Sequence, residues 1–332
     1  MLIALGALLA TFVFADAVVT VINITQRSGP IASTVHRGVR ALSRGLPHRI
    51  RAITGVVITL AIVLSWTFGL WIAWTVAMLD PAVAIRTADG QPVDGLAGAV
   101  YVAGFSIFTL GTGDLEAGTA VGRLVTVFAS FTGLFTVTFE VTYLLSLLTA
   151  VAHERSTARK TFALGPDVAT IVRRSWDGRT FRTVEPLLHD VARDLVRLAE
   201  DHRTFKVLHD VLPTDRSTAL GPSLLALSDA ADVLHYAADE QLSITELTHA
   251  VLTAAIDGVI AGMPEHETDD EPPPPSDPAG LFAVLGIPAA RRVPVDDENS
   301  WRRRCLYALA TEEGWRSVVD EAVGTSGTER DQ

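Results

Sequence analysis

The stretch Ser106-Ile107-Phe108-Thr109-Leu110-Gly111-Thr112-Gly113-Asp114 lies between two long apolar runs of the sequence. Gly111 and Gly113 stand two residues apart, and glycine takes left-handed backbone dihedrals without steric cost. A chain that alternates ordinary and left-handed dihedrals aims successive backbone carbonyls the same way. Rings of such carbonyls can replace the hydration shell of a cation. The stretch is therefore predicted to be an ion-selectivity filter.

The residue types within this stretch suit that interpretation. Thr109 can add a hydroxyl to its own carbonyl at the first ring of ligands. Asp114 places negative charge where the filter would meet outside water, and there it would concentrate cations. We expect the ion to be coordinated by five residues: Thr109, Leu110, Gly111, Thr112 and Gly113.

This segment resembles the pore of the potassium channel family, whose pattern is Thr-x-x-Thr-x-Gly-Tyr-Gly-Asp. Here the pattern is Ser-x-x-Thr-x-Gly-Thr-Gly-Asp. The match continues without a gap, since Gly122 and Arg123 fall where bacterial two-helix members carry Gly-Arg at the start of the inner helix. Gly133 falls at the family's hinge glycine, so the resemblance implies that it permits inner-helix bending. It also implies a homotetramer with the pore on the symmetry axis, because each chain carries one such stretch.

The segment departs from the family at Thr112, which replaces the aromatic residue of the filter. The backbone carbonyl remains, but the large ring that packs behind the filter is missing. Tyr101, Phe105 and Phe108 are candidates to fill that space. Phe105 stands where some bacterial members keep a buried carboxylate, so Asp114 is not expected to make that contact. Potassium is the expected permeant ion, and its selectivity over sodium is left open.

The composition is too apolar for an ordinary soluble protein of 332 residues, with 48% hydrophobic residues and a mean hydropathy of +0.32. Apolar runs at residues 2–22, 52–79 and 121–151 reach the roughly 20 residues that a spanning helix needs. The apolar run 99–108 is shorter and suits a re-entrant pore helix. We therefore expect an all-α membrane protein with three transmembrane helices. The pore helix and filter lie between the second and the third.

Charges predict the orientation of these helices. Residues 23–51 contain six Arg and no acidic residue, which is typical of a cytoplasmic loop. Contact of this loop with anionic lipid is a further possibility. His153, Arg155, Arg159 and Lys160 follow the third span. A multi-pass cell-membrane protein is expected, with its N-terminus outside and its C-terminal domain cytoplasmic. Trp66, Trp71 and Trp74 would suit the outer interface.

Two carboxylates fall inside predicted spans, where they are costly and mark candidate sites. Asp16 either lies near the cytoplasmic end of its helix and reaches the headgroups, or has a functional role. Glu140 either attracts cations into the pore cavity or hydrogen-bonds a neighbouring helix. The resemblance implies that an apolar stripe of the inner helix faces the axis: Leu134, Val137, Val141 and Leu145.

The remaining sequence predicts a soluble helical part. Apolar residues recur at helical spacing in 185–202, 217–239 and 244–263, and 300–323 forms another helical segment. The expected division of the chain is 1–22 N-terminal span, 23–51 basic loop, 52–151 pore domain, 152–263 helical cytoplasmic domain, 264–279 acidic Pro-rich linker, and 280–332 helical segment and tail.

Several function classes find no support in the sequence. The net charge of −11 argues against nucleic acid as a partner. The sequence contains no Gly-x-Gly-x-x-Gly motif after a strand, so a nucleotide-binding domain is not expected. None of the predicted spans carries repeated Arg residues, so a voltage sensor of that type is not expected. The single cysteine, Cys305, excludes an intrachain disulfide. No metal beyond the permeant monovalent cation, and no cofactor, is expected. Five histidines lie among acids without metal-ligand spacing: His189, His202, His209, His235 and His249.

The sequence therefore leads to one principal hypothesis and one competitor. The principal hypothesis is a passive cation channel, not an enzyme, that conducts potassium through a tetrameric filter. The competitor is a non-conducting membrane sensor or scaffold that keeps a pore-like fold while its cytoplasmic helices bind a partner, and Thr112 motivates it. A membrane-anchored enzyme would need a catalytic constellation within 156–323, and none is evident in the sequence.

Overall fold

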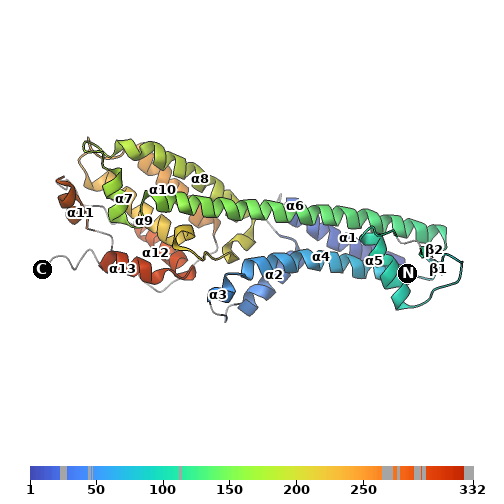
Figure 1. Cartoon of the computed structure of the whole chain (residues 1–332). Helices are drawn as coiled ribbons and strands as arrows, with labels where there is room; N and C mark the ends of the chain where they lie inside the picture. The colour runs from blue at the N-terminus through green and yellow to red at the C-terminus, as the bar shows by residue number, and fades with distance from the viewer. Residues whose placement is uncertain are drawn as a thin grey trace. The chain divides into compact units, whose positions relative to one another are not determined.

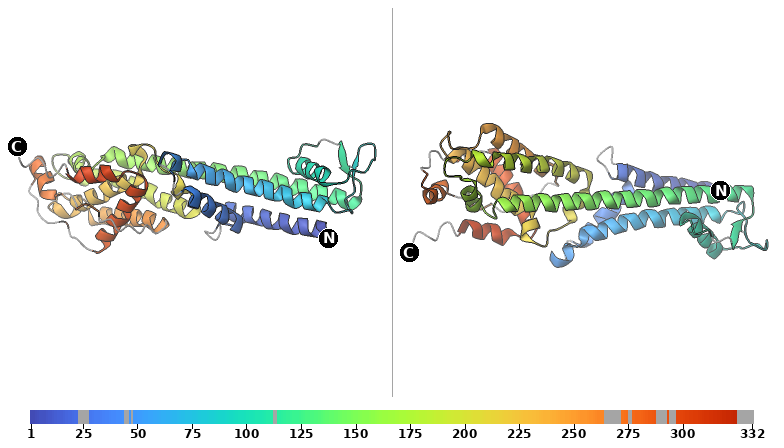
Figure 2. Two further views of the ribbon diagram at one scale, coloured as in Figure 1. Left: turned by 90° about the horizontal axis from the view of Figure 1, so that it is seen from below. Right: turned by 45° about the horizontal axis from the view of Figure 1, so that its top comes forward.

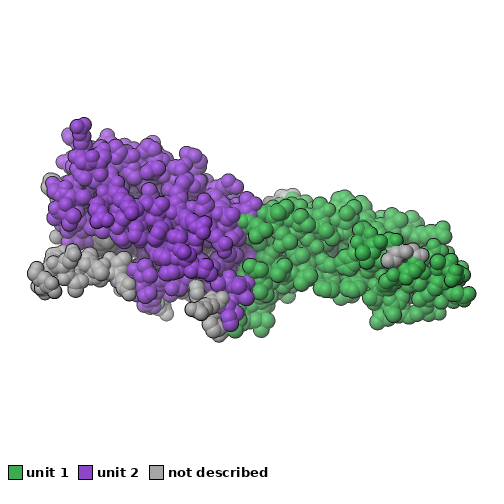
Figure 3. Space-filling model, in the orientation of Figure 1, with its two compact units in different colours: residues 1–46, 54–148 green, residues 47–53, 149–332 purple. Residues whose placement is uncertain are grey.

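A computed structural model describes residues 1–332 except 23–27, 44–45, 47, 112–113, 264–271, 275–276, 288–292, 294–296 and 325–332. The described chain is mainly helical (Figure 1). It divides into two compact units, residues 1–46 with 54–148 and residues 47–53 with 149–332 (Figure 3). Each unit is described by itself.

The first unit contains the three described helices that are long and apolar enough to cross a membrane. These are α1 (Leu2–Ile22), α4 (Thr54–Met78) and α6 (Ala120–Leu164), the last of which continues into the second unit. Within the first unit they lie side by side (Figure 2), with ring contacts between Phe14 and Phe139 at 5.8 Å and between Trp66 and Tyr143 at 5.9 Å. The remaining elements of this unit are α2 (Pro30–Ser43), β1 (Ile85–Thr87), α5 (Leu96–Ile107) and β2 (Leu115–Ala117).

Small residues let α1 approach α4 closely. A Cβ added at Gly6 would lie 2.6 Å from the Ala73 carbonyl oxygen and 2.7 Å from the Ala77 Cβ. Close backbone approach through small residues is typical of helix pairs in membranes. Trp66 and Leu70 of α4 are fully buried, so this face of α4 is a protein interface.

The first unit differs from the sequence prediction in three places. The short apolar helix α5 begins at Leu96 and ends at Ile107, earlier than the predicted 99–108. Residues 30–43 of the basic loop form a helix, α2, which the sequence analysis did not predict. The all-α prediction was also incomplete, because β1 and β2 form a small antiparallel sheet with Ile85 opposite Ala117. Strands of three residues carry too few positions to show a period of two.

The second unit is built from short helices around one apolar core. Its elements are α3 (His48–Arg51), α7 (Val168–Ser175), η1 (Arg182–Val184), α8 (Glu185–Thr204), η2 (Lys206–Asp210), η3 (Arg216–Thr218), α9 (Leu220–Asp232), η4 (Val233–Ala237), α10 (Glu246–Gly262), α11 (Pro278–Leu285), α12 (Asp297–Glu312) and α13 (Arg316–Gly324). The predicted helix 300–323 is two helices, α12 and α13, separated by Gly314 with φ of 84°. The predicted helix 217–239 is η3, α9 and the π-helical turn η4.

Charged groups are also buried in the second unit. Arg303 pairs with Asp229, and Arg302 forms two hydrogen bonds with Asp257 at 2.6 and 2.9 Å. Burial raises the pKa of Asp229 to about 6, although Arg303 opposes this shift. These pairs link α12 to α9 and α10. Removing one partner of such a pair would leave an uncompensated buried charge.

Glu313, directly after α12, is 4% exposed and accepts hydrogen bonds from the amides of Leu220 and Gly221 at 3.1 and 2.9 Å. Burial raises the pKa of Glu313 from 4.5 to about 8. The folded state therefore favours the protonated form. The resulting stability is complete below pH 4.5 and is lost as the pH rises through about 8. Burial lowers the pKa of His202 to about 4, so His202 destabilises the fold only at acid pH.

We therefore expect the free energy of unfolding to fall by about 2 kcal/mol between about pH 6.5 and about pH 8, at about 1.4 kcal/mol per pKa unit. Glu313→Gln keeps an oxygen for the two amides and removes the titration, so its stability should be flat over the same range. Thermal unfolding of detergent-solubilised protein measures both. Parallel pH curves for the wild type and the variant would contradict this assignment.

Candidate functional site

The candidate filter segment, residues 106–114, begins in the last turn of α5. The turn continues beyond the helix, because the amide of Thr109 donates to the Ser106 carbonyl at 3.3 Å and that of Leu110 to the Phe105 carbonyl at 3.0 Å. Thr109 then has φ of 53° and Gly111 has φ of 63°, whereas Leu110 between them is not among the described residues with positive φ. Positive φ at Thr109 and Gly111 therefore alternates with the conformation of Leu110 over these three residues. Thr112 and Gly113 lie outside the described residues.

The left-handed conformation of Thr109 was not predicted, since the sequence analysis placed left-handed dihedrals only at the glycines. A non-glycine residue in this region costs about 1–3 kcal/mol and persists where the surrounding structure imposes it. Ser106 and Ile107 are buried, but residues 108–111 are exposed in the single chain, with Leu110 68% and Phe108 39% exposed. Neighbouring copies of the chain would be needed to enclose it.

The C-terminal end of the segment is held by a hydrogen bond that the sequence analysis missed. The Tyr101 hydroxyl of α5 donates to both carboxylate oxygens of Asp114, at 3.0 and 3.1 Å. Tyr101 also contacts the Phe105 ring edge-on at 5.6 Å. The sequence analysis considered only Phe105 as the residue of α5 that would face Asp114. The partner of Asp114 is instead Tyr101, one helical turn earlier. Spacing on a helix would have shown Tyr101 and Phe105 to share a face.

Trp71 and Trp74 of α4 help to position α5 and α6. The Trp71 indole donates to the Val100 carbonyl at 2.9 Å, and its ring packs edge-on against Phe108 at 5.9 Å. The Trp74 indole donates to the Thr132 hydroxyl of α6 at 2.8 Å. Both side chains bind other helices, and the placement of the tryptophans at the outer interface stays a prediction.

Gly133 of α6 lies directly against the end of α5. A Cβ added there would lie 2.7 Å from the Ile107 Cα and would overlap the Ile107 carbonyl oxygen. The absence of a side chain therefore lets α6 touch Ile107, which lies two positions before Thr109 in the candidate filter segment. α6 is one continuous helix through Gly133, and the bending role implied by the family resemblance stays a prediction.

Glu140, the intramembrane carboxylate of α6, is 7% exposed and accepts a hydrogen bond from the Thr67 hydroxyl of α4 at 2.6 Å. Of the two roles considered from sequence, this contact favours the link to a neighbouring helix over the cavity role. The expected pore-lining stripe lies elsewhere on α6 and is exposed in the single chain: Leu134 58%, Val137 42%, Val141 51% and Leu145 60%.

This geometry makes a prediction that separates the two roles of Glu140. Glu140→Gln keeps an acceptor for Thr67, so we expect thermal stability, and any potassium conductance of the wild type, to stay unchanged. Thr67→Val removes the hydrogen bond and should cost about 1 kcal/mol of stability. A severalfold fall in conductance for Glu140→Gln, measured in planar bilayers, would restore the cavity role.

Asp16 of α1 connects three helices. Its carboxylate is 3% exposed and accepts hydrogen bonds from the Trp66 indole of α4 at 2.8 Å and from the Ile31 and Ala32 amides at 2.7 and 3.3 Å. The amides belong to the first turn of α2, so a side chain of another helix caps α2. Of the two alternatives considered for Asp16, this burial argues against contact with headgroups; the contacts link three helices, and a functional role stays a prediction.

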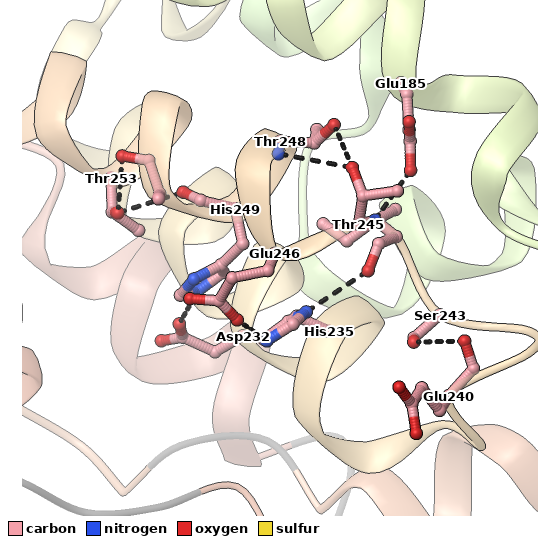
Figure 4. Close-up of polar contacts among 12 residues, drawn as sticks. Glu185, Asp232, His235, Glu240, Ser243, Thr245, Glu246, Thr248, His249 and Thr253 are labelled. Carbon is pink, nitrogen blue, oxygen red and sulfur yellow. Dashed lines mark hydrogen bonds and ion pairs between the residues drawn. The ribbon is translucent and has the colours of Figure 1, made fainter.

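The histidines of the second unit have nearby partners (Figure 4). His249 bonds Asp232 at 2.8 Å, His235 pairs with Glu246 at 2.8 Å, and the two rings stack 4.7 Å apart. His189 bonds the Thr248 hydroxyl at 3.0 Å. Among the described residues, no group of three or more His, Cys, Asp or Glu side chains is arranged to hold a metal ion. The geometry of these pairs fits local structural contacts between helices.

Comparison with known proteins gives one informative similarity. No protein-family model matches the chain, and no solved structure matches it. The uncharacterized membrane protein YdjJ of Bacillus subtilis (strain 168) is 28% identical over 333 residues, a match that covers 97% of this chain and 96% of that protein. The similarity therefore spans both units, and it agrees with a membrane protein that has apolar spanning helices.

Proposed function

We propose that the chain is a passive cation channel that conducts potassium, with the backbone carbonyls of residues 109–113 of four chains coordinating the ion. The observation that carries this proposal is the pair of left-handed residues, Thr109 and Gly111, at the end of the short helix α5. Left-handed dihedrals at alternate positions turn successive carbonyls toward one side. α5 is also too short to span a membrane, and it lies in sequence between the apolar helices α4 and α6.

Further contacts support a pore built around this segment. α4 holds α5 through Trp71, α6 meets α5 at Gly133, and Tyr101 holds Asp114 at the end of the segment. The apolar stripe on α6 and residues 108–111 are exposed in the single chain, so neighbouring copies can reach them. A homotetramer around a central axis would supply them.

Flux through the purified wild-type protein in liposomes tests the proposal. Potassium and sodium gradients are imposed separately, with empty liposomes as the control, and the ratio of the two fluxes measures the effect of Thr112 on selectivity. We expect potassium flux above the control. If a folded oligomer passes neither ion at any voltage or pH, the channel proposal fails.

That failure would favour the second candidate, a non-conducting sensor or scaffold. The replacement of the filter aromatic by Thr112 is the observation that favours it. The second unit would then bind a cytoplasmic partner, and a pull-down from membranes should return that partner in stoichiometric amount.

A further inference from the structure

The second unit contains a cavity lined by acidic and apolar side chains that the channel proposal does not use. The empty space among its lining side chains is about 370 Å³, a figure that includes open solvent at its mouth. Three carboxylates line it: Glu154 of α6, Glu312 at the end of α12, and Glu313 directly after α12. Among the described residues that line it, none is Lys or Arg. We call it the acidic cavity.

His202 of α8 provides an independent sign of a missing ligand. Its side chain lines the acidic cavity and is 2% exposed, yet its Nε2 has no hydrogen-bond partner among the described residues. Its other ring nitrogen, Nδ1, lies 3.1 Å from Nδ1 of His209. A buried polar atom without a partner costs about 1–3 kcal/mol, so such atoms usually bind a ligand or water.

The charges of the cavity call for a cation. Burial raises the pKa of Glu154 well above 4.5 and that of Glu313 to about 8, and the two carboxylates are close enough to repel each other. Burial also keeps His202 neutral at physiological pH, with a pKa of about 4. A neutral imidazole can accept a hydrogen bond at Nε2, and carboxylates accept several. Each of these groups would gain from a bound positive charge with N–H donors.

The spacing of the acceptors favours an ammonium group over a metal ion. Metal ligands must converge to about 2.0–2.2 Å from the ion, and no described group of three His, Cys, Asp or Glu meets that need. An ammonium nitrogen binds its acceptors at about 2.7–2.9 Å, so they can lie farther apart. The remaining walls include Leu208, Leu212, Pro213 and Met263, which suit a short alkyl chain.

We propose that the acidic cavity binds a small primary alkylammonium ion, with Glu154, Glu312 and Glu313 supplying the negative charge and His202 Nε2 accepting a hydrogen bond. This inference goes beyond the proposed channel activity. Its test needs no conduction, so either proposal can fail while the other stands. Glu154 lies on α6, the helix that also carries Gly133. The ligand would therefore contact α6, and α6 also contacts the end of α5.

Binding to the full-length wild-type protein in detergent is the first test. Isothermal titration calorimetry in sodium buffer compares ethylammonium with tetramethylammonium, which has the same charge but no N–H donor. Because hydrogen bonds to charged groups contribute about 1.5–3 kcal/mol, ethylammonium should bind at least about tenfold more tightly. Equal affinities, no binding of either ion, or binding of zinc or manganese alone would overturn the proposal.

Variants locate the site. Glu154→Gln and Glu312→Gln should each weaken ethylammonium binding at least about tenfold. Glu298→Gln, which removes an exposed carboxylate from α12 away from the cavity lining, should leave the affinity within about twofold of wild type. Thermal unfolding without ligand identifies a variant that fails to fold. Unchanged affinity in both cavity variants would overturn the proposal.

The pH dependence provides a readout that non-specific attraction would not give. Glu313 must lose its proton to attract the ligand, so affinity should rise about tenfold between about pH 6.5 and about pH 8.5. The charged and titratable groups near it are Glu154, Glu312, His202, His209 and Arg216. In Glu313→Gln this rise should be clearly smaller, and what remains comes from Glu154, whose pKa burial also raises. An equal rise in wild type and Glu313→Gln would contradict the role of Glu313.

Discussion

Gly133→Ala is expected to abolish potassium flux, because the new methyl group overlaps the backbone of Ile107 at the end of α5. Helix backbones cannot yield as a flexible side chain does, so α6 and α5 must separate. Thr109, which has a left-handed conformation, follows Ile107 by two residues, so we expect a displacement of α5 to disturb it. A shift of about 1 Å in such a preorganised site is sufficient to impair function.

The matched control is Thr138→Ala on the same helix. Thr138 is exposed, and its hydroxyl bonds only the Leu134 carbonyl of its own helix among the contacts described. We expect this variant to retain flux. Flux through Gly133→Ala equal to that of Thr138→Ala, in liposomes that contain equal amounts of oligomer, would show that the close approach is not needed.

Asp16→Ala is expected to cause the largest loss of stability in the first unit. It removes the acceptor for the Trp66 indole, which would stay buried without a partner. It also removes the acceptor for the Ile31 and Ala32 amides, so the first turn of α2 would lose its cap. Loss of a cap costs about 1 kcal/mol, and a hydrogen bond to a charged group contributes about 1.5–3 kcal/mol. The sum is about 3 kcal/mol.

Thermal unfolding in detergent and hydrogen exchange of the α2 amides measure this effect. Asp16→Asn keeps one oxygen and should lose less, whereas Asp89→Ala removes an exposed carboxylate and should match the wild type. Unchanged exchange in α2 on Asp16→Ala would mean that the cap does not hold this helix.

The features visible in the sequence were those with a strong local pattern. Long apolar runs predicted α1, α4 and α6, and the paired glycines marked the candidate filter segment before Thr109 was found to be left-handed. Contacts between distant residues had no such pattern. Asp16 lies 15 residues before Ile31 and 50 before Trp66, and no periodicity links a carboxylate on one helix to the amides of another.

Burial decided the roles that the sequence left open. Glu140 could face a cavity or a helix, and only the position of Thr67 on α4 separates these alternatives. The unpartnered His202 nitrogen and the protonated Glu313 also depend on how several elements pack. Residue type and spacing suggested histidines among acids, but they could not show which of them lines a cavity.

The measurement that tests the central claim most directly is potassium flux through Gly111→Ala beside Gly90→Ala. Both glycines have positive φ, 63° and 81°, and at both an added Cβ meets no atom within 4 Å. The substitutions therefore impose similar backbone strain, but only Gly111 belongs to the candidate filter segment. We predict that flux is lost in Gly111→Ala and retained in Gly90→Ala, with both proteins assembled as the wild type. Wild-type flux through Gly111→Ala would contradict the account.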